Sequence, residues 1–184
     1  MDYPKNNDVT SLILELVRLY KPKLYMEIGT QKGYTFCKVA PLVNKAVAVD
    51  TKIYPAVRLA GVNVLCWEET SDMFFARLDI CPENQLDMVF IDGCHDAIQV
   101  CSDVVNSIKH VTPGTGLILV HDTYPVDSRL EKPDRCGGAW KAIKQLKVSK
   151  YAPELEILTL PGPYYGLTII RKVSVYKHFG VDNR

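Results

Sequence analysis

The chain has 184 residues, with 22 Lys and Arg against 21 Asp and Glu, which leaves a net charge of +1. A hydrophobic share of 47% and a charged share of 23% are ordinary for one globular domain, and they exclude disordered, collagen-like and coiled-coil chains. The balanced charge argues against a dedicated nucleic-acid binder, so we expect no nucleic-acid partner.

Apolar runs in this chain are short. The longest, at 88–91 and 117–120, fall far below the roughly 18 residues that a membrane helix needs. The first residues lack the basic start and the apolar stretch of a signal peptide. We therefore expect a cytoplasmic protein that has no membrane partner.

Helix and strand patterns alternate along the sequence. A helix is expected at about 9–20, because Asp8 is a good N-cap and apolar residues then recur at helical spacing. Strands are expected at 24–29, 45–50, 61–66, 86–92, 117–120, 155–160 and 167–171. Helices are expected between them at 34–42, 57–59, 71–78, 97–110 and 138–147. A loop rich in Pro, Gly and charge covers 123–138.

This alternation predicts an α/β fold with an open, mostly parallel sheet and helices on both faces. The last two strands have no room for a crossover helix between them, so we expect them to form an antiparallel hairpin. No interdomain linker is visible, and we expect one domain over 1–184 with its core at about 24–171.

Polar residues gather where the apolar strands end, which is where open sheets of this kind bind ligands. Gly29 and Gly33 follow the first strand and allow a sharp turn before a helix, although plain turn glycines would look the same. Asp50 ends the second strand about 20 residues later, where an acid can accept hydrogen bonds from both hydroxyls of a ribose. A solvated strand-end Asp or a helix cap is the alternative for Asp50.

Four motifs in order carry a family resemblance: Glu27-Ile-Gly-Thr-Gln-Lys-Gly33, Asp50, Asp92-Gly-Cys-His95 and His121-Asp122-Thr123. With them the chain resembles class I S-adenosylmethionine-dependent methyltransferases, in particular small O-methyltransferases of the caffeoyl-CoA and catechol type. The resemblance spans roughly 24–171. It implies a Rossmann-like sheet of seven strands whose last strand is antiparallel.

The resemblance also assigns residues to the cofactor. It implies that Glu27, Gly29 and Gly33, with Thr30 in the same turn, surround the methionine part, and that Asp50 holds the ribose. It places Ser71 and Asp72 near the adenine, although an N-cap box for the helix at 71–78 would explain this pair equally well. Asp92 is expected beside the cofactor as well.

The reactive residues implied by the resemblance are Asp92, Asp122 and His95. Metal-dependent relatives bind Mg²⁺ through acids after the fourth and fifth strands, and Asp92 and Asp122 match two of these positions, whereas Thr123 stands where a stronger ligand is expected. His95 stands where such relatives place a base, and a structural His in a tight turn is its alternative. His121 is a reactive candidate as well, although a structural role in its loop is the favoured interpretation.

The acceptor side is less defined by the sequence. The loop at 124–137, together with Tyr164 and Tyr165, can form a wall for the acceptor, or it can be a disordered surface loop. We expect a methyltransferase that acts on the oxygen of a small-molecule acceptor, with or without the assistance of a divalent metal such as Mg²⁺, in a chain able to form homo-oligomers. The alternatives are an enzyme similar to sugar- or antibiotic-modifying hydroxylases, and a non-catalytic S-adenosylmethionine-binding module that needs a partner.

Overall fold

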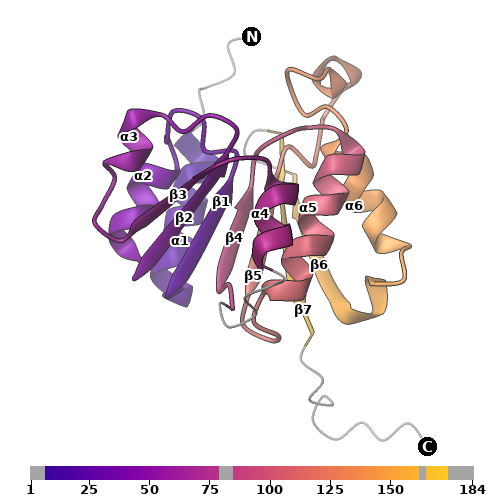
Figure 1. Cartoon of the computed structure of the whole chain (residues 1–184). Coiled ribbons are helices and arrows are strands. Elements are labelled where there is room, and N and C mark those ends of the chain that lie inside the picture. The colour runs from indigo at the N-terminus through magenta and orange to yellow at the C-terminus, as the bar shows by residue number, and fades with distance from the viewer. Residues whose placement is uncertain (1–6, 79–84, 162–164, 174–184) are drawn as a thin grey trace, which may run out of the picture.

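The structure is a computed structural model, which describes residues 7–78, 85–161 and 165–173. Its helices and strands alternate as the sequence patterns predict (Figure 1). In chain order they are α1 Asn7–Tyr20, β1 Leu24–Ile28, α2 Phe36–Val39, β2 Lys45–Asp50, α3 Pro55–Arg58, β3 Val64–Glu68, α4 Ser71–Leu78, β4 Met88–Ile91, α5 Ala97–His110, β5 Leu117–His121, α6 Ala139–Lys147, β6 Leu155–Leu160 and β7 Leu167–Lys172. Short 3₁₀ helices lie at Ala40–Leu42, Ser128–Glu131 and Ala152–Glu154.

The strands form one seven-stranded sheet in the order β3-β2-β1-β4-β5-β7-β6. The pairs β3–β2, β2–β1, β1–β4 and β4–β5 are parallel, whereas β7 is antiparallel to both β5 and β6. The predicted Rossmann-like sheet with its antiparallel last strand is therefore confirmed. The direction of winding reverses between β1 and β4, and ligands of such sheets bind beside this switch point.

Helices cover both faces of the sheet, as expected (Figure 1). One apolar cluster joins α4, α5 and α6 to the face that carries Met26, Val89 and Ile118. The other joins α1, α2 and α3 to the face that carries Phe90 and Leu119. The central strands read as nearly continuous apolar runs because both of their faces are buried.

Several boundaries differ from the sequence-based expectation, and three of them have a local explanation. The first helix begins at Asn7, so Asp8 lies inside it instead of capping it. The second helix is shorter, because regular α-helix ends at Val39 and Pro41 stands in the 3₁₀ turn that follows. β3 begins at Val64 instead of residue 61, since the Asn63 amide donates to the carbonyls of Ala40 and Val43 at 2.9 and 2.8 Å and so belongs to a turn.

The loop after β5 is packed rather than disordered. It contains the 3₁₀ helix Ser128–Glu131, and the side chains of Leu130 and Cys136 are buried. Tyr164, the other expected part of the acceptor wall, lies outside the described residues.

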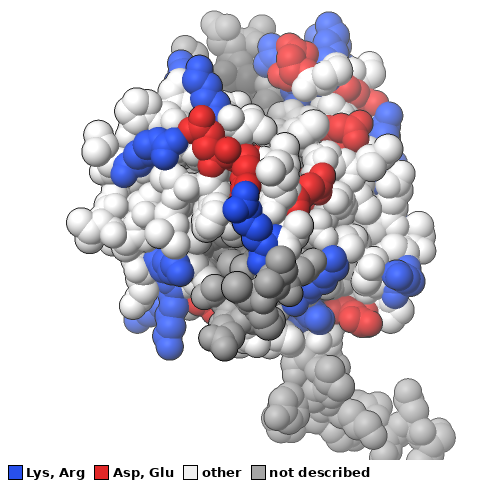
Figure 2. Space-filling model, in the orientation of Figure 1, with Lys and Arg blue, Asp and Glu red and all other residues white. Residues whose placement is uncertain are grey.

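The charged side chains are distributed as expected for a chain with balanced charge. Acidic and basic side chains are interspersed over the face that carries α4 and α5 (Figure 2). Among the residues that the structure describes, no helix has the length and apolar character required to cross a bilayer.

Candidate functional site

The turn after β1 lies directly against the end of β4. Gly29 has a φ of +86°, and a Cβ atom there would lie 2.3 Å from the Asp92 carbonyl oxygen. Only glycine combines this backbone conformation with such a close approach. Gly29 therefore fixes the end of β1 against the end of β4 at the switch point of the sheet.

Asp50 holds this turn from the end of β2. Its carboxylate accepts the backbone N–H of Gln31 at 2.8 Å and that of Lys52 at 3.0 Å. Each carboxylate oxygen has a second lone pair, so Asp50 can also accept hydrogen bonds from a bound ligand. Asp50 thus stabilises the turn after β1 and also lies on the wall of a pocket.

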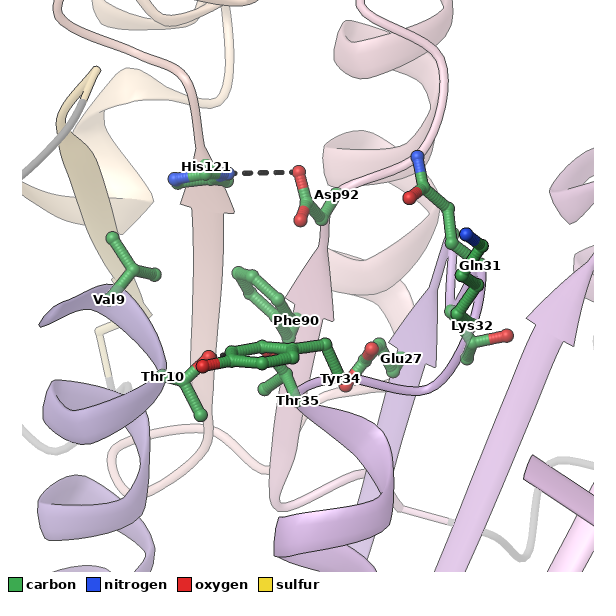
Figure 3. A pocket seen from close by; sticks show the side chains of 12 residues that line it. Val9, Thr10, Glu27, Gln31, Lys32, Tyr34, Thr35, Phe90, Asp92 and His121 are labelled. Atoms are coloured by element: carbon green, nitrogen blue, oxygen red, sulfur yellow. Dashed lines mark hydrogen bonds and ion pairs between the residues drawn. The ribbon is translucent and has the colours of Figure 1, made fainter. Parts of the chain in front are cut away.

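Two pockets meet at the carboxyl ends of the strands. The first has a volume of about 430 Å³ and opens between α1, β1, β4 and β5 (Figure 3). The second has about 420 Å³ and opens between β1, β2, α4 and α5. Gly29, Gln31 and Asp92 line both, so the two pockets form one continuous site across the switch point.

The first pocket holds two of the predicted cofactor residues on its wall. Glu27 is 2% exposed, and burial is the main reason why its pKa rises to about 8. Thr30 is also buried, and its hydroxyl has no hydrogen-bond partner among the described residues. Buried polar groups are normally satisfied, so the Thr30 hydroxyl is available to a ligand.

The second pocket contains Asp50, Ser71 and several residues that sequence reasoning missed. The Ser71 hydroxyl donates to the buried Asp103 carboxylate at 2.6 Å, and the Gln99 amide donates to the same carboxylate at 3.1 Å. Burial raises the pKa of Asp103 to about 6. Glu69 also lines this pocket, and one of its carboxylate oxygens is buried without a described partner while the other meets Arg77 at 2.7 Å.

Two predicted cofactor residues lie off the pocket walls. Asp72 is exposed and faces α5, where it accepts hydrogen bonds from the Ser102 hydroxyl at 3.2 Å and from the Gln99 amide at 3.4 Å. Gly33 has a φ of +83°, and a Cβ there would lie 2.6 Å from Cys37 Sγ. Its position is explained by packing of the turn against α2.

Four acidic and imidazole side chains meet at the ends of β4 and β5. His95 Nε2 lies 3.0 Å from Asp122 Oδ2 and 3.8 Å from Asp92 Oδ1. His121 Nδ1 lies 3.0 Å from Asp92 Oδ1, which Figure 3 shows as a dashed line. His121, for which a structural role in its loop was favoured, also lies on the wall of the first pocket. The sequence did contain a signal for this pocket position, because His121 directly precedes Asp122 at the end of β5.

These contacts shift the protonation of the cluster. Hydrogen bonding to Asp92 and the nearby charge of Asp122 raise the pKa of His95 against the opposing effect of burial. Burial raises the pKa of Asp122 to about 6. Burial also opposes ionisation of Asp92, but His121 and His95 outweigh it and lower the pKa of this carboxyl.

The same cluster has a donor set that fits a divalent cation. One potential ligand atom from each of Asp92, His95 and Asp122 lies within 4.8 Å of the others. Thr123 does not join them, because its buried hydroxyl accepts a hydrogen bond from the Thr168 hydroxyl at 2.8 Å. The third potential donor beside the two carboxylates is therefore the His95 imidazole and not a side chain at position 123.

The loop after β5 holds His95 in place. Gly138 donates its backbone N–H to the His95 carbonyl at 2.6 Å, and a Cβ at Gly137 would lie 2.6 Å from the same oxygen. Tyr165 Oη accepts a hydrogen bond from Arg135 at 3.0 Å. Gly137 and Gly138 in the loop after β5 therefore hold His95 with its imidazole beside the carboxylates.

The comparisons with known proteins agree with this arrangement. A family model described as a methyltransferase domain matches residues 26–123, which contain the Gly29 turn, Asp50, Asp92 and Asp122. The chain belongs to this methyltransferase family. A search of curated proteins finds no match.

Solved methyltransferase structures share the fold. The O-methyltransferase TomG of Streptomyces achromogenes, which is involved in tomaymycin synthesis and was solved with S-adenosylmethionine (SAM), is 18% identical with a TM-score of 0.73, over 94% of this chain and 83% of that one. PaMTH1 of Podospora anserina, solved with S-adenosylhomocysteine (SAH), is 21% identical with a TM-score of 0.71, over 94% and 81%. An O-methyltransferase of Bacillus cereus in complex with SAH is 16% identical with a TM-score of 0.70, over 94% and 84%.

Proposed function

We propose that this methyltransferase transfers the methyl group of SAM to an oxygen atom of a small-molecule acceptor. The observation that carries the proposal is the pair of pockets that share Gly29, Gln31 and Asp92 beside the switch point. One pocket suits the adenosyl half of the cofactor. The other suits its methionine half and, next to the acid–imidazole cluster, an acceptor.

The cofactor contacts in this proposal follow from the pocket walls. Asp50 accepts the ribose hydroxyls, and the wall near Ser71 receives the adenine. Glu27 and Thr30 bind the amino acid end of the methionine in the first pocket. This arrangement directs the sulfonium methyl group toward Asp92, which lines both pockets, and toward the neighbouring His121 on the wall of the first pocket.

The reaction is a displacement at the methyl carbon. The S–CH₃ bond breaks, an O–CH₃ bond forms, the sulfonium becomes the neutral thioether of SAH, and the acceptor oxygen loses its proton. The cofactor brings its own leaving group, so the protein mainly aligns the two reactants, an effect that can be worth roughly 7–11 kcal/mol.

The acceptor proton passes to His95 in our proposal. Its Nε2 atom lies 3.0 Å from Asp122 Oδ2, so the imidazolium formed by proton transfer is stabilised by a buried carboxylate. A positioned base of this kind contributes about 10²–10⁴ in rate.

A divalent cation such as Mg²⁺ fits the same residues. Asp92 and Asp122 would hold it, which leaves the His95 imidazole to act as the base, and the cation would supply Lewis-acid polarisation of the acceptor oxygen. Two carboxylates favour Mg²⁺, whereas an imidazole donor also suits Mn²⁺ or Zn²⁺.

Thermal unfolding with SAM, SAH and NAD, each with and without Mg²⁺, tests the cofactor first. A ligand at about 100 times its Kd adds roughly 2.7 kcal/mol, which raises the Tm of a domain of this size by roughly 5–10 °C. We expect this rise with SAM and SAH, its loss in Asp50→Ala, and no rise with NAD. No rise with either adenosyl ligand would refute the proposal.

Product analysis then separates the remaining functions. Formation of SAH together with a methylated acceptor supports transfer, whereas an oxidised acceptor without SAH would indicate a hydroxylase. Tight binding of SAM without turnover would indicate a binding module. A chelator that abolishes turnover shows that a divalent cation takes part in the reaction, and turnover that survives the chelator shows that the reaction does not need one.

A further inference from the structure

A polar pair is buried in the middle of the central strand β1. Tyr25 and Glu27 lie two residues apart, so they share the face of β1 that packs toward α1 and α2. Tyr25 is 0% exposed and Glu27 is 2% exposed. Their cross-strand neighbours on β2 are Ala46 and Ala48, whose small side chains leave space for the two larger ones.

A short hydrogen bond joins the pair. The Tyr25 hydroxyl donates to Glu27 Oε2 at 2.6 Å, and the backbone N–H of Phe36 provides a further hydrogen bond to the same carboxyl group. The Tyr25 ring is held in turn against the Phe36 ring, with 6.3 Å between centroids. The hydroxyl group therefore has a fixed position behind the carboxylate.

Glu27 has no cationic partner among the described residues, because none of their ion pairs includes it. A buried carboxylate without a counter-ion is costly, so Glu27 carries a proton in the ligand-free protein near neutral pH, with a pKa raised to about 8. The carboxyl group nevertheless lies on the wall of the first pocket. A cationic group of a ligand there would complete an ion pair.

We propose that Tyr25 is a positioning residue for the cofactor's ammonium group, because its hydroxyl holds the Glu27 carboxylate at the wall of the pocket that receives the methionine end. The inference rests on the proposed function, since the ammonium group is that of SAM or SAH. The Tyr25 hydroxyl donates to Glu27, and in this proposal the residue acts through that carboxylate.

Burial has the largest effect on the ionisation of Glu27, and the hydrogen bond from Tyr25 opposes that effect. The Tyr25 hydroxyl favours the charged carboxylate, as does the Phe36 N–H, whereas burial and the negative charges of Asp92 and Asp50 oppose it. The Cys37 thiol on α2 is the other titratable group that interacts with this carboxylate. Removing the Tyr25 hydroxyl therefore makes Glu27 harder to ionise and weakens its attraction for an ammonium ion.

Calorimetric titration of the full chain with two ligands tests the proposal. SAH carries the ammonium group, whereas 5′-methylthioadenosine keeps the adenosine and sulfur but lacks the amino acid end. For Tyr25→Phe we expect SAH affinity to fall about tenfold at pH 7, while methylthioadenosine affinity stays within about twofold. Tyr151→Phe, which removes a hydroxyl beside the far cluster of the core, should change neither affinity.

The pH profile provides a second readout. Wild-type affinity for SAH should rise between pH 6 and pH 8 as Glu27 ionises more readily, and the rise should move to higher pH in Tyr25→Phe. Equal losses for both ligands, or unchanged SAH affinity and pH profile in a folded variant, would overturn the role of Tyr25. Failure of the wild type to bind either ligand would instead reject the proposed function and this inference with it.

Discussion

Glu27 is a buried carboxylic acid, and its burial disfavours the charged form. Its pKa of about 8 lies above its ordinary value of 4.5, so the folded chain holds an extra proton between these values. Folding stability from this group is therefore fully present below pH 4.5 and is lost as pH rises toward and through 8. The residue reduces the stability of the ligand-free protein near neutral pH and, in our proposal, serves ligand binding.

Glu27→Gln should separate these two effects. Glutamine keeps the size of the side chain and can still accept the Tyr25 hydrogen bond, but it carries no charge. We expect the Tm of the ligand-free variant to exceed that of wild type by roughly 3–8 °C at pH 8, with the difference shrinking toward pH 4.5, while the rise caused by SAH is lost. Glu154→Gln at an exposed position is the control, and a lower Tm for Glu27→Gln at pH 8 would contradict this account.

His95 is the second residue whose chemistry depends on its neighbours. Its pKa is raised by the acids beside it, and a base must be neutral to accept a proton. The transfer rate should therefore rise with pH through a midpoint above the ordinary His value of 6.5. His95→Ala should lower kcat about 10²–10⁴-fold and leave SAH affinity within about threefold, measured by SAH formation and by titration. A pH-independent rate in wild type would argue against this role.

Among elements, the loop between β5 and α6 positions the reactive end of the site. Gly137 has a φ of +52°, and a Cβ there would meet His95 at 2.6 Å. Gly114 also has a positive φ, of +82°, but it lies in the turn before β5, away from His95. A substitution at either glycine would therefore strain the backbone, but only a substitution at Gly137 would also press a side chain against His95.

Gly137→Ala should displace His95, whereas Gly114→Ala should not. Both variants should lose about 1–2 kcal/mol of stability from the strained backbone. Only Gly137→Ala should also reduce turnover, by at least tenfold, with SAH affinity little changed. Denaturant unfolding and SAH formation measure the two effects, and equal turnover in the two variants would show that this loop does not position the imidazole.

The elements themselves could be predicted from the sequence where apolar periodicity was strong. The helix at Ala97–His110 and the strand at Lys45–Asp50 match the predicted bounds, because each is an uninterrupted pattern between polar or turn residues. The start of β3 could not be predicted in this way, because the hydrogen bonds of Asn63 to Ala40 and Val43 are made only in the folded chain.

The site was predictable only in part for the same reason. Asp92 and Asp122 follow apolar strands, which marks them in the sequence. Asp103 lies within a helix and Tyr25 within a strand, where nothing in the sequence distinguishes them from ordinary surface and core residues. Their roles depend on partners 32 and 2 residues away, respectively, that the fold brings into contact.

At the scale of the whole molecule, both apolar clusters use the same sheet. One face of the sheet contributes Val89 and Ile118, and the other contributes Phe90 and Leu119 from the same two strands. Loss of either cluster exposes strands on which the other depends. The fold should therefore unfold as one unit.

Scanning calorimetry should show a single transition with equal calorimetric and van't Hoff enthalpies. For 184 residues we expect an unfolding enthalpy of about 130 kcal/mol near 60 °C and a heat-capacity change of about 2–3 kcal/mol/K. SAH should shift the whole transition to higher temperature. Two resolved transitions, with only one of them shifted by SAH, would indicate that the halves of the sheet unfold separately.

The contact between the Gly29 turn and the Asp92 carbonyl separates the pocket residues into two groups. The turn for the cofactor and the acid beside the acceptor touch through backbone, so a change in one displaces the other. Val9, Thr10 and Tyr34 reach the same cavity from α1 and from the segment before α2, and they are free of that constraint. If the first pocket receives the acceptor as we propose, substitutions at these outer residues should change acceptor choice while leaving the β1 and β4 ends intact.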